Sequence, residues 1–139
     1  MDAVDSEIER NKQVVRDEIA AMETGDTETQ ERLLTDDVRW WFPQSAVENT
    51  GLPRPMEGKE AVVGLLGGVD VYFSETHWTI DQMVAEGDHV AVHAHMQGRT
   101  ASGNDYLNQY HMLYRLEGGR IAEVWEHLDT AYAFARMAP

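Results

Sequence analysis

The chain has 139 residues, 42% of them hydrophobic, which is enough for one domain with its own core and no stabilising cross-links. Its 11 basic and 25 acidic residues give a formal net charge of −14, so the surface repels phosphate backbones and anionic membrane surfaces. The lack of cysteine excludes disulfides, thiol catalysis and cysteine metal sites. We therefore predict a single domain over residues 1–139 that binds neither nucleic acid nor membrane.

The beginning of the chain carries the spacing of amphipathic helices. Apolar residues recur at intervals of three and four over residues 4–24, and Gly25 is suited to end that helix. A second short helix follows, which Asp26 or Thr27 can cap. The first five residues lack the basic and apolar regions of a signal peptide, and no apolar run is long enough to span a bilayer. We therefore expect a cytoplasmic protein.

The remainder of the chain alternates short elements with turns. Residues 38–42 read as a strand that Pro43 ends, and residues 44–57 as a loop long enough to rim a pocket. Gly58 opens a third helix that runs to about residue 66. Four strands are then predicted: residues 77–86, residues 89–98, and the two runs on either side of the Gly118-Gly119 turn.

This order of elements predicts the fold class. Helices that precede a series of consecutive strands are typical of α+β proteins, in which the helices pack on one face of a mainly antiparallel sheet. Residues 130–137 either extend the last strand or form a short helix. A curved sheet around a long helix leaves a pocket at its open end, where ligand sites are common.

The final hairpin contains the main candidate for chemistry, Glu126. Side chains alternate between the two faces of a strand, so Glu126 shares a face with Ala122, Val124 and Leu128. A carboxylate on an apolar face is costly unless it is hydrogen-bonded or neutralised, and such groups are frequent at functional sites. We interpret Glu126 as an acid/base whose pKa is raised by its apolar neighbours. The alternatives are a structural Glu bound to a backbone group or an Arg, and a register shift that exposes it.

Other side chains are predicted to complete a site around Glu126. Asn108 and Tyr110 share the inward face of their strand and could hold a substrate carbonyl. His77 is a candidate second acid/base, although strict alternation places it opposite Trp78. The predicted substrate contacts are Trp40, Phe42, Met56, Trp78, Met112, Tyr114, Val124 and Leu128, with Leu52 at the pocket mouth; for Tyr114 and the aromatic residues, packing in the core is the alternative.

The sequence resembles the nuclear transport factor 2-like superfamily. The resemblance rests on Gly25-Asp26 after the first helix, on the run from Leu34 to Trp40, and on Gly58-Lys59-Glu60-Ala61-Val62 at the third helix. The closing pattern over residues 110–130 is similar to the SnoaL-like branch of this superfamily. The resemblance implies a cone-shaped fold with three N-terminal helices on a curved sheet. It leaves the activity open, because this fold carries cyclases, isomerases, dehydratases, epoxide hydrolases and non-catalytic binders.

Comparison of single positions with the catalytic residues of two branches of the superfamily reduces the number of activities to consider. In steroid Δ5-3-ketoisomerases, the positions of the catalytic Asp base, the protonated Asp and the helix-one Tyr correspond to Phe42, Met112 and a position near Glu18. This chain therefore lacks the base and both donors that such an isomerase needs. In contrast, Glu126 falls where related phenazine-biosynthesis proteins carry a catalytic Glu.

Histidines on the opposite sheet face suggest a second hypothesis. His93, His95, His111 and His127 share the polar parity of three strands and could begin a metal site. The resemblance implies instead that this face forms a dimer interface in which imidazoles hydrogen-bond. We therefore predict no metal, no cofactor and a homodimer through the sheet.

The leading hypothesis is a cofactor-independent proton-transfer enzyme of the isomerase, cyclase or dehydratase type. Its substrate would be a small hydrophobic carbonyl compound. The alternatives are a non-catalytic small-molecule-binding module of the same fold and a dimeric interaction protein whose His-rich face is the working surface.

Overall fold

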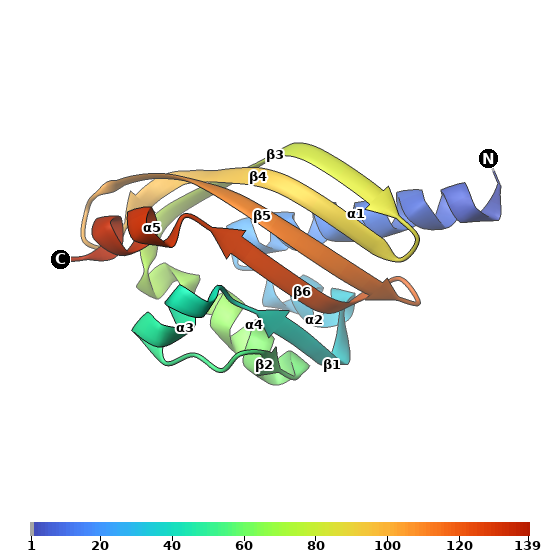
Figure 1. Cartoon of the computed structure of the whole chain (residues 1–139), viewed down its shortest axis with the longest axis horizontal. Coiled ribbons are helices and arrows are strands. Elements are labelled where there is room, and N and C mark those ends of the chain that lie inside the picture. Colours follow the sequence, from blue (N-terminus) through green and yellow to red (C-terminus); the bar gives the residue numbers. More distant parts are fainter. Residues whose placement is uncertain (1) are drawn as a thin grey trace.

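A six-stranded sheet organises the chain in the computed structural model, which describes residues 2–139 (Figure 1). The strand order is β2-β1-β6-β5-β4-β3, and all neighbours pair antiparallel except β1 and β6, which run parallel. The predicted α+β class is confirmed, with a mixed, mainly antiparallel sheet. The strands are β1 Leu34–Trp41, β2 Met56–Glu57, β3 Phe73–Glu86, β4 His89–Thr100, β5 Asp105–Glu117 and β6 Arg120–Leu128.

Helix boundaries follow local capping chemistry. The side chain of Asp2 accepts a hydrogen bond of 2.9 Å from the backbone N–H of Asp5 at the start of α1, and Gly25 ends that helix with a left-handed φ of 68°. Asp26 caps α2 through the backbone N–H of Thr29. The helices are α1 Ala3–Thr24, α2 Thr27–Leu33, α3 Gln44–Thr50, α4 Lys59–Gly67 and α5 Thr130–Met137, with a short 3₁₀ turn at Val69–Val71.

The segment predicted as a loop, residues 44–57, contains α3 and β2 instead. Helix α3 buries none of its residues, so it lacks the apolar periodicity by which a helix is recognised in a sequence. Pro43 precedes it with a φ of −56°, and Gly51 ends it in the left-handed conformation. Strand β2 is only two residues long and depends on its pairing with β1, which no local pattern reveals.

Other boundaries differ by a few residues. Strands β1 and β3 each begin four residues before the predicted start, at Leu34 and Phe73. Residues 130–137 form helix α5 rather than an extension of β6, because the side chain of Asp129 caps the backbone N–H of Tyr132.

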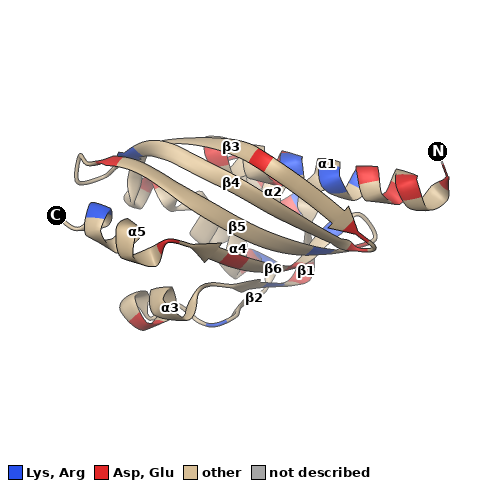
Figure 2. Cartoon of the chain, turned by 45° about the horizontal axis from the view of Figure 1, so that its top comes forward, with Lys and Arg blue, Asp and Glu red and all other residues tan. Residues whose placement is uncertain are grey.

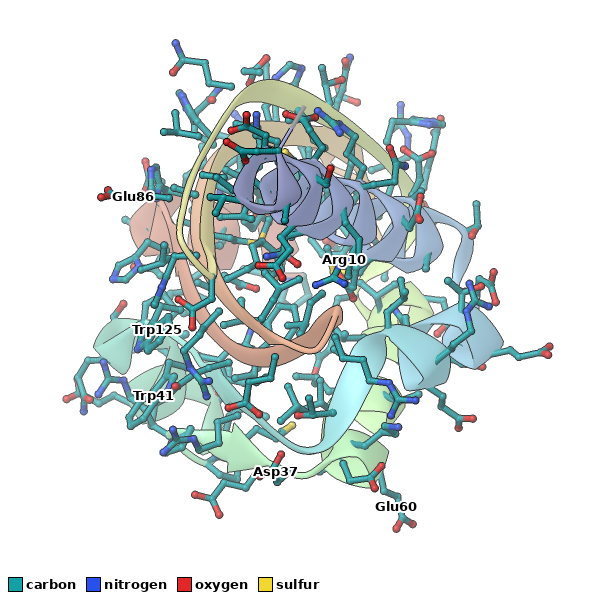
Figure 3. The ribbon with its side chains drawn as sticks, turned by 90° about the vertical axis from the view of Figure 1, so that its right-hand side faces the viewer. Arg10, Asp37, Trp41, Glu60, Glu86 and Trp125 are labelled. Carbon is teal, nitrogen blue, oxygen red and sulfur yellow. The ribbon has the colours of Figure 1, made fainter. Side chains whose placement is uncertain are left out.

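The core lies between α1 and the concave face of the sheet. Figure 3, viewed nearly along α1, shows the strands curving around this helix. The apolar stripe of α1, which includes Val15, Ile19 and Met22, is buried, and the helix packs against β3, β4 and β6. The predicted inward parity of Tyr110, Met112, Tyr114 and Leu116 on β5 is confirmed, since all four are buried.

Charged residues are frequent along α1 and at the ends of the strands, while much of the strand length is uncharged (Figure 2). Within residues 2–139, no helix is long and apolar enough to cross a membrane.

Gly98 on β4 permits the close approach of β3 near a register shift between Phe73 and Glu75. A Cβ atom at position 98 would overlap the carbonyl oxygen of Glu75 and lie 2.9 Å from its carbonyl carbon. We expect Gly98→Ala to lower the free energy of unfolding by about 1–3 kcal/mol, because backbone atoms must move. Urea unfolding measures the change.

Gly64→Ala is the matched control, because no atom lies within 4 Å of the added Cβ on helix α4. It is expected to be stabilising by about 0.5–1 kcal/mol, as Ala is a better helix former than Gly. An unchanged unfolding midpoint for Gly98→Ala would contradict the close approach.

Candidate active site

An internal cavity of about 220 Å³ lies at the open end of the sheet. Helices α3 and α5 border its mouth, where the hydroxyl of Ser45 donates to that of Thr130 at 2.8 Å. The lining is predominantly apolar, and Glu126 is its one charged side chain among the described residues. The aromatic residues of the lining are Phe42, Tyr72, Phe73, Trp78, Tyr110 and Phe134.

A larger groove of about 720 Å³ lies on the outside, between α2 and α4. It is wide open to solvent, and the charged residues that line it, such as Glu31, Asp36 and Lys59, lie at the surface. Ligand sites are usually concave and largely apolar with a few converging polar groups. The internal cavity, and not this groove, meets that description.

Strand β6 places Glu126 on the inner face, and strand β1 supplies its hydrogen-bond partner. The indole Nε1–H of Trp40 donates to the Glu126 carboxylate at 3.2 Å. Parallel pairing sets Trp40 opposite Val124, so the indole reaches diagonally along the same face. Burial raises the pKa of Glu126 to about 7, and the hydrogen bond from Trp40 opposes part of this rise. The carboxyl group therefore changes its charge near neutral pH.

A second carboxyl group, Glu18 of α1, is completely buried. Neither of its oxygens has a hydrogen-bond partner among the described residues. Burial, and then the negative charge of Glu126, raise the pKa of Glu18 to about 8. No sequence motif assigned a function to Glu18. The signal was present, because Glu18 interrupts the apolar stripe of Val15, Ile19 and Met22 on one helix face.

Tyr110 lines the cavity and belongs to a short chain of hydroxyl groups. Its hydroxyl lies 2.8 Å from that of Tyr106, which also accepts a hydrogen bond of 2.8 Å from Nδ2 of Asn108. Burial holds the pKa of Tyr110 well above its usual value, so the phenol keeps its proton and can act as a donor. Asn108 does not reach the cavity, contrary to the prediction, because it also donates to the carbonyl of Asp129. It holds Tyr106 in place instead.

The predicted substrate contacts divide into two groups. Phe42, Trp78 and Leu128 line the cavity, as does Leu52 at its mouth. The other predicted contacts face inward but belong to the core and do not line the cavity, because side chains of α1 and α4 cover that part of the concave face. These corrected positions are Trp40, Met56, Met112, Tyr114 and Val124.

His77 does not reach the cavity either. Its side chain is exposed and lies 2.7 Å from the carboxylate of Glu75 on the outer face. The strict alternation of the strand holds at this point: Trp78 faces the cavity and His77 faces outward.

The outer face of the sheet carries the remaining predicted histidines. His93, His111 and His127 are direct cross-strand neighbours, and His95 lies 2.8 Å from Asp81. Within residues 2–139, no three His, Cys, Asp or Glu side chains are arranged to hold a metal ion. The homodimer through this face stays a prediction.

A sequence profile of the SnoaL-like domain family matches residues 15–124, so the chain belongs to that family. The fold is that of nuclear transport factor 2-like proteins, as the resemblance implied. No curated protein matches the sequence significantly.

Solved structures share the whole architecture. A nuclear transport factor 2-like protein of unknown function from Burkholderia pseudomallei is 23% identical, with a TM-score of 0.84 over 94% of this chain and 98% of its own. A candidate SnoaL-like polyketide cyclase from Jannaschia sp. CCS1 is 16% identical, with a TM-score of 0.83 over 100% and 97%. TerC, co-crystallised with polyporic acid, is 17% identical, with a TM-score of 0.81 over 92% and 98%. At these identities the likeness shows the fold.

The raised pKa of Glu18 links folding to pH. Its usual value is 4.5, so at neutral pH the folded protein holds this proton more tightly than the unfolded chain does. The stability contribution of Glu18 is therefore complete below about pH 4.5 and is lost as the pH rises to about 8. At pH 8.5 we expect the free energy of unfolding of Glu18→Gln to exceed that of the wild type by up to about 4 kcal/mol. The difference should shrink at pH 5.

Thermal unfolding at both pH values measures this difference. Glu7→Gln, which changes an exposed carboxyl group of the same helix, is the control and should differ from the wild type by less than about 0.5 kcal/mol at either pH. A Glu18→Gln protein that is less stable than the wild type at pH 8.5 would show that the carboxylate is stabilised by a partner.

Proposed function

We propose that this chain is a cofactor-independent enzyme that moves a proton at the carbon next to a carbonyl group of a small hydrophobic compound. The observation that carries the proposal is Glu126, a carboxyl group with a pKa of about 7 on the wall of an apolar cavity. A general base works best when its pKa lies near the operating pH. Solved structures of the same fold include a candidate polyketide cyclase and TerC co-crystallised with polyporic acid, which supports a small-molecule substrate.

In this mechanism the Glu126 carboxylate removes a proton from the carbon next to the carbonyl, and the electron pair moves onto the carbonyl oxygen. The hydroxyl of Tyr110 supports this oxygen. When Tyr106 donates the hydrogen bond between the two phenols, the proton of Tyr110 is free for the substrate. The protonated Glu126 then returns its proton to a different carbon, which completes an isomerisation.

The same enolate can follow two other routes. Its carbon can attack a second carbonyl of the substrate, which gives an aldol-type cyclisation with Glu126 protonating the new alkoxide. Alternatively, the enolate can expel a hydroxyl group that Glu126 protonates, which releases water. Each route returns Glu126 to its carboxylate form.

Two features of the cavity support this chemistry. Trp40 holds one carboxylate oxygen, so the carboxyl group is oriented before the substrate binds. The apolar lining excludes water from the enolate. Since a cavity of about 150 Å³ can hold benzene, a volume of about 220 Å³ suits a substrate with one or two rings.

The proton-transfer step can be tested without knowing the final product. The wild type is incubated in D₂O with a panel of uncharged cyclic ketones, and replacement of hydrogen at the carbon next to the carbonyl is followed by NMR. We expect Glu126→Gln to slow the exchange about 10²- to 10⁴-fold. The wild-type rate should rise with pH and level off above about pH 7, since the base is the ionised form.

His77→Gln is the matched control and should leave the exchange unchanged, because its side chain is exposed on the other face. Exchange that is catalysed equally by Glu126→Gln would exclude Glu126 as the base. Saturable binding of a ketone without any exchange would favour the non-catalytic binding module.

Loss of the Tyr110 hydroxyl should affect the same reaction differently. We expect Tyr110→Phe to slow exchange about 10- to 10³-fold, because one donor to the developing oxyanion is removed. The pH at which the rate levels off should stay near 7, since Glu126 is unchanged. An equal exchange rate in the wild type and Tyr110→Phe would show that a different group donates to the carbonyl oxygen of the substrate.

A further inference from the structure

The charge balance of the cavity restricts which ligands it can take. Among the described residues no Lys, Arg or His lines it, while Glu126 does. The histidines next to lining residues in sequence, such as His77, His111 and His127, lie on the outer face. The arginines nearest to the lining in sequence are engaged outside the cavity. Arg54 donates to the carbonyl of Phe42 and lies over the ring of Trp41, and Arg136 lies over the ring of Tyr132.

The other ionisable groups around Glu126 carry no positive charge. Helix α1 contributes the carboxyl group of Glu18, and strand β5 contributes the phenols of Tyr106, Tyr110 and Tyr114. The cavity-lining residues of β3, β4, α3, α4 and α5 include no ionisable side chain. Tyr72, which lies just before β3 and is exposed to solvent, also lines the cavity and is neutral at physiological pH. An anionic ligand would therefore meet only like or neutral groups, and a cation would meet a carboxylate.

Two aromatic rings form a corner on the cavity wall. The ring centroids of Trp78 and Tyr110 lie 4.6 Å apart with an angle of 57° between the planes. They stand on β3 and β5, on either side of β4, and can meet because the residue of β4 opposite Tyr110 is the small Ala94. The hydroxyl oxygen of Tyr110 lies 2.8 Å from that of Tyr106, and both Trp78 and Tyr110 line the cavity. Ring faces attract cations through their quadrupole.

This corner lies close to Glu126. Strand pairing sets Tyr110 opposite Leu128 and Met112 opposite Glu126, so Tyr110 and Glu126 are diagonal neighbours on the inner face. Diagonal neighbours in an antiparallel pair have Cα atoms roughly 7–8 Å apart, within reach of long and aromatic side chains. A group between them would contact the carboxylate and the rings together.

We propose that the cavity binds a small hydrophobic ammonium compound, with its cationic nitrogen between the Glu126 carboxylate and the rings of Trp78 and Tyr110. The inference rests on the cavity of the proposed function and names its substrate class, a carbonyl compound that also carries a cationic nitrogen. Such a substrate favours the ionised form of Glu126, which is the form that a base requires.

Ionisation of Glu126 distinguishes this mode of binding from simple filling of an apolar space. A buried cation needs a counter-charge, so its affinity should follow the ionised fraction of Glu126. With a pKa of about 7, that fraction rises about thirty-fold between pH 5.5 and 8.5. A neutral ligand of the same shape gains nothing from this change.

Three probes of nearly equal shape test the proposal: choline, 3,3-dimethyl-1-butanol and 3,3-dimethylbutanoate, which are cationic, neutral and anionic at pH 8. Their dissociation constants are measured by NMR titration of the full chain. We expect choline to bind at least tenfold more tightly than the neutral alcohol, and the anion to bind most weakly. The choline affinity should rise with pH as above, while that of the alcohol stays constant.

Variants test whether the preference for choline depends on the Glu126 carboxylate and on the ring of Trp78. Glu126→Gln should reduce the preference for choline over the alcohol to less than threefold. Trp78→Leu should weaken choline several-fold and the alcohol less, and Trp125→Leu, on the outer face, should change neither (Figure 3). Equal binding of choline and the alcohol to the wild type, a preference that survives in Glu126→Gln, or no binding of any probe would each overturn the proposal.

This result is independent of the exchange experiment, which uses uncharged ketones. A choline preference without ketone exchange would leave the cation site standing and remove the proton-transfer function. Ketone exchange without a choline preference would support the proton-transfer function and exclude the cation site.

Discussion

The parallel pairing of β1 with β6 is the constraint on which the site depends. It sets the neighbours Trp40 and Trp41 beside Val124 and Trp125, and adjacent side chains of a strand point to opposite faces. The indole of Trp40 therefore reaches Glu126 on the inside at 3.2 Å, while that of Trp41 reaches Glu123 on the outside at 2.8 Å. Figure 3 shows Trp41 and Trp125 together on the outer side. A slip of one residue would reverse both contacts.

These two carboxylates of one strand differ in chemistry because their surroundings differ. On the outside, Arg39 and Arg115 lie 3.0 and 3.3 Å from the buried Glu123 and hold it in two partly exposed ion pairs that connect three strands. On the inside, Glu126 has one neutral indole donor, an apolar cavity and a second carboxyl group, Glu18, behind it. An ion-paired carboxylate is a structural group, whereas an unpaired one near neutral pKa can exchange protons.

The long helix α1 decides how much of the concave face is available to a ligand. Its stripe of Val15, Ile19 and Met22 packs over part of the sheet, so inward residues such as Tyr114 belong to the core. Only the end bordered by α3 and α5 remains open. Solved structures of 16–23% identity share this fold, whereas the side chains at that end of this chain determine what its cavity accepts.

Local patterns in the sequence by themselves determined the α+β class, the inward parity of β5 and β6, and the presence of Glu126 on the apolar face. These features repeat every two or every three to four residues, so they can be recognised without knowing what packs against them. Only the tertiary structure decided that Trp40 supports Glu126, that Glu18 lies behind it, and that α5 borders the mouth. It also decided that His77 and Asn108 lie outside the cavity. Such contacts join segments far apart in the chain, and a strand pattern tells which face a side chain occupies but not which distant element covers that face.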